Sequence, residues 1–171
     1  MDRLSVHGVS TDRLTIEVTE SNVVGTLTEA LEILSRLRMR GVRLSIDDFG
    51  TGHSTLTQLE RFPFSELKID RSFTNGIVLS PESRAIVHST IGLAQELGLS
   101  VVAEGVETYR QLEMLIRAGC DEAQGYLITR PLAAADLESW YSTMAGERTS
   151  RAAVENLATT GFTQDQAACR P

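Results

Sequence analysis

The segment Val42-Arg43-Leu44-Ser45-Ile46, followed directly by Asp47-Asp48-Phe49-Gly50-Thr51-Gly52, decides what this chain can be. Its first five residues predict a short strand, and Asp47 and Asp48 then place two carboxylates at the strand tip. Because neighbouring side chains on a strand point to opposite faces, the strand must end here for both carboxylates to reach one site. Two carboxylates so close raise each other's pKa unless a cation lies between them, and their oxygens suit Mg²⁺, Mn²⁺ or Ca²⁺. The alternative is an acidic turn in which one Asp caps the next helix.

Around this segment, short β-type runs alternate with longer helical runs. The expected strands are residues 14–18, 42–46, 67–69, 99–103 and, more weakly, 122–124. Helical periodicity covers residues 27–37, 53–60, 81–97, 112–116 and 137–141. This alternation predicts an α/β fold with a parallel sheet, for which the doubly wound sheet and the (β/α)₈ barrel are the two main solutions. The composition changes near Gly146, so we expect one domain over residues 1–145 and a flexible tail over residues 146–171.

Composition narrows the class of protein. The 171 residues contain 16 basic and 23 acidic side chains, and the net charge of −7 argues against a general nucleic-acid-binding surface. No apolar run approaches the ~20 residues that a membrane helix needs, and the N-terminus lacks a signal-peptide core, so we expect a cytoplasmic location without a membrane segment. Cys120 and Cys169 have no metal-type spacing and are expected to be free thiols.

Polar residues recur where the expected strands end. These residues are Glu17, with Glu20 nearby; Asp47 and Asp48; Lys68 and Asp70; Glu104; and Gln124. Each one alone has an ordinary explanation, such as a solvated strand end or a surface charge. Together they would lie on one edge of a parallel sheet, where α/β proteins collect catalytic and binding groups. Carboxylates that hold cations, a lysine that faces an anion and a glutamate that accepts a proton predict a two-metal site that hydrolyses phosphate esters.

The same residues resemble the EAL family of bacterial cyclic di-GMP phosphodiesterases over about residues 4–142. The resemblance is carried by Ile16-Glu17-Val18-Thr19-Glu20-Ser21, Asp47-Asp48-Phe49-Gly50-Thr51-Gly52, Leu67-Lys68-Ile69-Asp70, Val102-Ala103-Glu104-Gly105-Val106-Glu107 and Gln124-Gly125-Tyr126, in matching order and spacing. It implies a (β/α)₈ barrel that linearises cyclic di-GMP to pGpG with Mg²⁺ or Mn²⁺, two ions in the complete site.

The resemblance also implies a role for each matched residue. Glu17, Asp47 and Asp48 match metal ligands, and Asp47 would bridge two ions. Lys68 matches the lysine that positions the attacking water. Glu104 matches a general base or second-metal ligand, and Gln124 matches a residue near the substrate. Glu20 matches a glutamate that steadies a loop coupled to dimerisation.

The chain also departs from the family pattern. The signature Glu-Ala-Leu tripeptide, whose glutamate is a metal ligand, is expected to be missing from this chain, and so is the arginine that follows it in the family. An asparagine ligand is expected upstream of Met1, while His53 and Thr55 replace a tyrosine and a serine. The resemblance therefore indicates the C-terminal part of the domain, about five of the eight βα units. Such a remnant is expected to expose an apolar sheet face and to need a second copy or a partner to cover it.

Loss of those ligands predicts weak or no activity for the chain alone. Two alternatives stay open at this point. A degenerate EAL module could bind cyclic di-GMP or another protein without hydrolysis. An enolase-type barrel could use Lys68 as a base, although the Asp-Asp pair suits two ions on a phosphate better than a single-metal enolate site.

Overall fold

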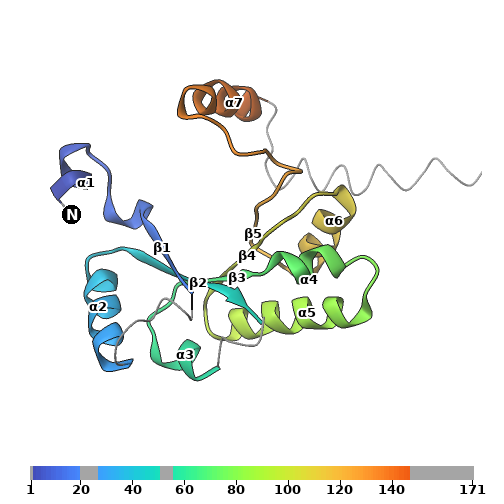
Figure 1. Ribbon diagram of the computed structural model, residues 1–171, viewed down its shortest axis with the longest axis horizontal. Helices are drawn as coiled ribbons and strands as arrows, with labels where there is room; N and C mark the ends of the chain where they lie inside the picture. Colours follow the sequence, from blue (N-terminus) through green and yellow to red (C-terminus); the bar gives the residue numbers. More distant parts are fainter. Residues whose placement is uncertain (1, 20–26, 51–55, 147–171) are drawn as a thin grey trace, which may run out of the picture. The chain divides into compact units, whose positions relative to one another are not determined.

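A computed structural model describes residues 2–19, 27–50 and 56–146 (Figure 1). Its elements are α1 (Asp2–Val6), η1 (Thr11–Arg13), β1 (Thr15–Val18), α2 (Leu27–Met39), β2 (Arg43–Phe49), α3 (Leu56–Arg61), β3 (Glu66–Ile69), α4 (Arg71–Gly76), α5 (Pro81–Glu96), β4 (Ser100–Ala103), α6 (Tyr109–Ala118), β5 (Glu122–Ala123) and α7 (Ala134–Gly146). The expected strands and helices occur in their expected order, and α1, η1 and α4 are added to them. The chain divides into two compact units, residues 1–128 and 129–171, each treated separately below.

The first unit contains a parallel sheet. Within the described residues it has five strands in the order β1-β2-β3-β4-β5, so each strand lies beside its neighbour in the chain. A doubly wound sheet reverses its strand order at a switch point, whereas consecutive units of a (β/α)₈ barrel do not. The strand order therefore selects the barrel, of which the described strands form five consecutive units. The expected fold class, a partial barrel, is confirmed.

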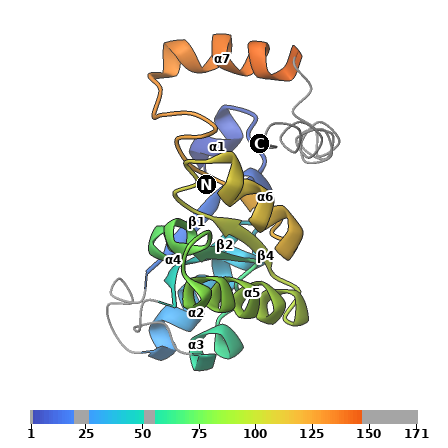
Figure 2. The same cartoon turned by 90° about the vertical axis from the view of Figure 1, so that its right-hand side faces the viewer.

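Helices cover one face of this sheet. Figures 1 and 2 show α2, α3 and α5 on the same side of the strands. Alternate strand residues, among them Leu44, Ile46, Leu67 and Ile69, are at most 1% exposed and pack against these helices. The helices contribute buried apolar residues that include Leu34, Leu59, Val87, Ile91, Ala94 and Leu115. This single core fixes the strands, and with them the side chains at the strand ends.

The opposite face of the sheet differs from the expectation of an exposed apolar surface. The strand positions between the core residues are mostly polar, and no residue of a described strand is among the exposed large hydrophobics. These positions carry Glu17, Arg43, Ser45, Asp47, Glu66 and Lys68. The expectation was wrong because it assumed an apolar barrel interior, whereas here charged side chains pair with one another across the strands.

Local signals explain several element boundaries. Pro81 lies at the start of α5, where its missing N–H costs nothing, and Ser80 caps that helix. Thr108 and Gln111 form a capping box at the start of α6, and Gly119 ends it in the left-handed conformation. No described helix combines the length and apolarity needed to cross a membrane.

The second unit is described only through its helix. Residues Ala134–Gly146 form α7, in which Ser142 and Thr143 donate hydrogen bonds to the carbonyl groups of Glu138 and Ser139. The expected tail over residues 146–171 lies almost entirely outside the described residues.

Candidate active site

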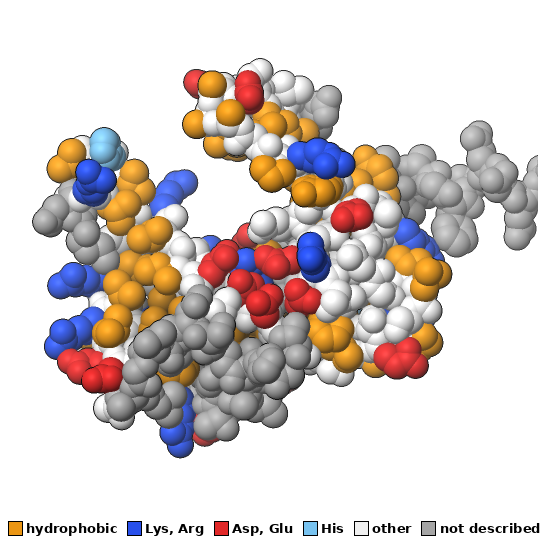
Figure 3. Space-filling model, in the orientation of Figure 1, with side chains coloured by type: hydrophobic (Ala, Val, Ile, Leu, Met, Phe, Trp, Pro, Cys, Tyr) orange, Lys and Arg blue, Asp and Glu red, His pale blue; other side chains and the backbone are white. Residues whose placement is uncertain are grey.

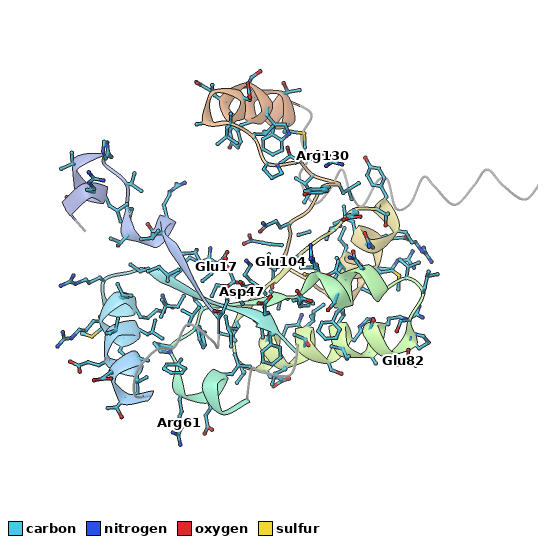
Figure 4. All side chains as sticks on the ribbon, viewed as in Figure 1. Glu17, Asp47, Arg61, Glu82, Glu104 and Arg130 are labelled. Atoms are coloured by element: carbon cyan, nitrogen blue, oxygen red, sulfur yellow. The ribbon has the colours of Figure 1, made fainter. Side chains whose placement is uncertain are left out.

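Lys68 lies at the centre of the polar strand ends. Its Nζ atom is 2.8 Å from Glu17 Oε1, 2.5 Å from Glu104 Oε1 and 3.6 Å from Asp47 Oδ1. The Lys68 side chain is only 5% exposed, so these ion pairs are shielded from solvent at the lysine. Figure 4 shows Glu17, Asp47 and Glu104 close together, and Figure 3 shows acidic side chains gathered on this face. Four strands, β1 to β4, thus bring four predicted residues together; we call this group the carboxylate cluster.

The Asp47-Asp48 pair occupies an irregularity in β2. The register between β2 and β3 shifts between Ile46 and Phe49, and Asp48 has a positive φ of 56°. The strand therefore does not end at Ile46, as the sequence suggested, but continues to Phe49 through a β-bulge. The extra residue removes the strict alternation of side chains, and the Asp48 N–H donates a 3.0 Å hydrogen bond to Asp47 Oδ1. Because of the bulge, the strand need not end before the two aspartates for their side chains to depart from strictly opposite faces.

Charge and burial act in opposite directions on these groups. Burial alone would lower the pKa of Lys68, but the hydrogen bonds with Glu104 and Glu17 and the charge of Asp47 outweigh it and raise that pKa. The pKa of Asp48 is raised, first by partial desolvation and then by the charges of Asp47 and Asp70. The lysine is therefore fully charged at neutral pH, and the site as a whole is rich in negative charge.

Asp70 has a structural task that the sequence did not reveal. β3 ends at Ile69, as the expected strand over residues 67–69 does, so Asp70 lies beyond the strand that carries the lysine. Asp70 is instead the N-cap of α4, and its carboxylate accepts a 2.9 Å hydrogen bond from the Ser72 N–H. That hydrogen bond opposes desolvation and contributes to a lowered pKa of Asp70.

The loop that carries Glu104 is held on both sides. The Glu104 N–H donates to the Ile69 carbonyl at 3.1 Å, and the Val106 N–H donates to the Gln124 carbonyl at 3.0 Å. Gln124 itself is exposed, and its N–H donates to Ala103 at 2.8 Å. The structure therefore places Gln124 next to the strand that precedes Glu104.

Gln111, in the first turn of α6, supports this loop and was missed by sequence analysis. It is buried, and its side-chain carbonyl accepts 2.8 Å hydrogen bonds from the backbone N–H groups of Glu107 and Thr108. Its amide group donates to Asn75 Oδ1 at 3.4 Å. The capping-box spacing of Thr108 and Gln111 was the signal that could have found it.

A second polar group lies on the same sheet face. Arg43 pairs with Glu66 at 2.9 Å and donates to Ser100 Oγ at 3.2 Å, and the Glu66 side chain is only 9% exposed. Glu66 precedes Lys68 by two residues on β3, so their side chains lie on the same face of the sheet. Sequence analysis did not predict this pair, because nothing in the pattern shows which charged strand residues face inward.

The carboxylate oxygens of the predicted ligands are of the type that hard divalent cations prefer. Glu17, Asp47 and Asp48 offer carboxylate oxygens of the kind that Mg²⁺ and Mn²⁺ prefer. Within the described part of the chain, however, no group of three His, Cys, Asp or Glu side chains is arranged to hold a metal ion. The carboxylates of Glu17, Asp47 and Glu104 converge on the Lys68 ammonium group instead.

Several residues that the sequence analysis named do not contribute to the carboxylate cluster as described. Glu20, the predicted loop-stabilising residue, lies outside the described residues, as do His53 and Thr55. The letters Glu-Ala-Leu do occur at Glu29-Ala30-Leu31, but within α2, where Glu29 is exposed and Ala30 and Leu31 pack against the core. This tripeptide therefore does not supply a strand-end carboxylate.

Comparison with known proteins shows the family. The EAL domain family model matches residues 1–131, and the chain belongs to the EAL domain family. It is 47% identical over 131 residues to the bifunctional diguanylate cyclase/cyclic di-GMP phosphodiesterase MucR of Pseudomonas aeruginosa; the match covers 77% of this chain and 19% of that protein. The chain thus spans about a fifth of the length of this curated relative.

Solved structures confirm the fold. The PaMucR phosphodiesterase in complex with cyclic di-GMP superposes with a TM-score of 0.73 at 46% identity, over 80% of this chain and 55% of that one. BlrP1 of Klebsiella pneumoniae, solved with manganese and cyclic di-GMP, has a TM-score of 0.70 at 39% identity, over 76% of this chain and 33% of that one.

Proposed function

We propose that this chain is the C-terminal part of a metal-dependent phosphodiesterase domain that hydrolyses cyclic di-GMP to pGpG. The observation that carries the proposal is the gathering of Glu17, Asp47 and Glu104 around Lys68 at the strand ends of an EAL domain. Relatives solved with cyclic di-GMP, one of them also with manganese, support the choice of substrate and of Mg²⁺ or Mn²⁺. In the complete site two ions are expected.

The proposed roles follow from the chemistry of each side chain. Glu17, Asp47 and Asp48 would hold the metal. A divalent cation bound there would supply Lewis acidity and lower the pKa of a coordinated water molecule. The ammonium group of Lys68 donates hydrogen bonds and suits the positioning of that water and of an anionic phosphate oxygen. Glu104, whose carboxylate is 22% exposed, is the candidate proton acceptor, and Gln124 is the candidate substrate contact.

The 171-residue chain by itself is expected to show negligible turnover. The family's Glu-Ala-Leu segment has no strand-end counterpart here, and loss of one such transition-state contact costs on the order of 10²–10³ in rate. Incubation of the chain with Mn²⁺ and cyclic di-GMP, followed by chromatography of pGpG, measures this. Rapid formation of pGpG would contradict the assignment of an incomplete site.

A complementary experiment restores the site. A chain extended by the N-terminal half of an EAL domain should hydrolyse cyclic di-GMP, and Asp47→Asn in that chain should abolish hydrolysis. The matched control is Glu82→Gln, since Glu82 is an exposed carboxylate in the first turn of α5, away from the cluster (Figure 4). Equal activity in the Asp47→Asn and Glu82→Gln proteins would refute the metal assignment.

The receptor function is the second candidate, because within the described residues the carboxylates of Glu17, Asp47 and Glu104 converge on Lys68 and no group of three His, Cys, Asp or Glu side chains is arranged to hold a metal ion. Under that alternative the module binds cyclic di-GMP, or docks on another protein, without turnover. Calorimetry with cyclic di-GMP on the extended chain separates the two: binding without pGpG formation identifies a receptor.

We also propose a cytoplasmic location and a domain that ends near residue 145. A homodimer or a partner that covers the open side of the sheet is a further proposal, which sedimentation of the purified chain would test.

A further inference from the structure

Lys68 is the only lysine in a chain whose other 15 basic residues are all arginines. It is also the most shielded cation of the candidate site, with a side chain only 5% exposed. An ammonium group is a compact point charge with three donors that can turn toward several neighbours, whereas a guanidinium group is larger and its five donors lie in one plane. Three carboxylates from three strands, β1, β2 and the end of β4, converge on this one group. The geometry of the site therefore calls for lysine in particular.

We propose that Lys68 is a built-in counter-ion that competes with the divalent cation for the same carboxylates. This inference rests on the proposed metal site and assigns that site a regulatory element. Glu17 and Asp47, two of the three proposed metal ligands, are already ion-paired with Lys68 at 2.8 Å and 3.6 Å. A metal ion that takes their oxygens must weaken these pairs, because the ammonium group and the metal carry charge of the same sign.

The charge balance supports competition. Lys68 with Glu17, Asp47 and Glu104 has a net charge of −2, so the lysine neutralises the cluster only in part. Negative charge therefore remains to attract a divalent cation, while the positive charge within a few ångströms of it reduces the affinity. The lysine thus keeps the carboxylates gathered and at the same time sets an upper limit on how tightly a metal binds.

Calorimetric titration with Mn²⁺ tests the competition directly. Lys68→Met removes the positive charge and should tighten Mn²⁺ binding by about tenfold or more, whereas Lys68→Arg keeps the charge and should not. The matched control is Arg61→Met, which changes the net charge equally at an exposed position on α3, away from the cluster in Figure 4. Equal or weaker Mn²⁺ binding by the Lys68→Met protein, relative to the Arg61→Met protein, would overturn the proposal.

A second measurement needs no substitution at Lys68. Because the chain has one lysine, uniform ¹⁵N labelling gives one lysine side-chain ammonium signal in an NMR spectrum, together with the backbone amide signals of the other residues. Titration with diamagnetic Mg²⁺ should shift or broaden this signal in step with the backbone signals of Asp47 and Asp48. An ammonium signal that stays unchanged while those backbone signals move to saturation would refute the competition, even if the Lys68→Met protein does not fold.

The proposed metal site and the competition by Lys68 are refuted by different results. If neither the unaltered chain nor any variant binds Mn²⁺ or Mg²⁺, both the proposed metal site and the competition are wrong. If the unaltered chain binds Mn²⁺ and Asp47→Asn removes that binding, the metal site stands. The affinity of the Lys68→Met protein and the ammonium signal then decide the competition alone.

Discussion

Replacement of Gly125 by alanine should distort the loop that carries Glu104. A Cβ atom built on Gly125 would lie 2.2 Å from the Val106 carbonyl oxygen and 2.3 Å from its nitrogen, roughly 1 Å short of the 3.4 Å at which ordinary contact begins. Both are backbone atoms, so no side-chain rotation relieves the clash. Val106 is fully buried, and its N–H and carbonyl form 3.0 Å hydrogen bonds with Gln124 and Leu127 on either side of the glycine.

The expected loss of stability follows from these contacts. Overpacking of a buried site costs about 1–3 kcal/mol, and two weakened backbone hydrogen bonds add about 1 kcal/mol each. The Gly125→Ala protein should therefore lose about 3–5 kcal/mol of unfolding free energy, measured by urea denaturation followed by circular dichroism. A melting temperature lowered by at least ~10 °C is the matching thermal result.

Gly92 provides the matched control. It lies within α5, and a Cβ atom at this position meets no other atom within 4 Å. Alanine is favoured over glycine inside a helix by about 1 kcal/mol, so Gly92→Ala should stabilise the chain slightly. If the Gly125→Ala protein unfolds at the same urea concentration as the Gly92→Ala protein, the tight packing of the Glu104 loop is refuted.

Three further predictions concern other buried groups. Burial raises the pKa of the Cys120 thiol to about 11. In a Cys169→Ser background its alkylation at pH 8 should therefore be roughly 100-fold slower than that of a free thiol, and equal alkylation rates would contradict the burial. The raised pKa also stabilises the fold below pH 9, and this contribution should be lost between pH 9 and 11, because the unfolded thiol ionises first. Arg43→Ala leaves the Glu66 carboxylate buried without its partner and should cost about 3–5 kcal/mol in urea denaturation, whereas conversion of both residues to leucine should recover most of that loss. Gln111→Leu removes the acceptor of two backbone N–H groups and should cost about 2–4 kcal/mol; a thermal melt like that of the unaltered chain would show that water replaces the amide.

Much of the fold could be predicted because it depends on local patterns. The apolar residues of β3 and β4, the proline that opens α5 and the glycine that closes α6 each act within a few residues of chain. The alternation of strands and helices did not by itself distinguish a barrel from a doubly wound sheet, because both use the same βα units; the family resemblance predicted the barrel. Strand order is a relation between segments far apart in the chain, and only the folded sheet shows it.

The candidate site shows the same division. The chemical types at the strand ends, carboxylates with one lysine, were evident from the order of residues. The pairing of Lys68 with Glu17 and Glu104 was not, because those residues lie 51 and 36 positions from it and meet only through the parallel register of the strands. The bulge at Asp48 was also missed, since it is defined by the partner strand rather than by the aspartates themselves.

By itself, the sequence of this protein determined the succession of strands and helices, its EAL family and the set of polar residues that strands present at their ends. Tertiary structure alone decided that the sheet face opposite the helices is mostly polar and that a single buried ammonium group holds three carboxylates together. The physical reason is range: propensity, capping and side-chain alternation act over a few residues, whereas an ion pair depends on where the backbone has carried both partners.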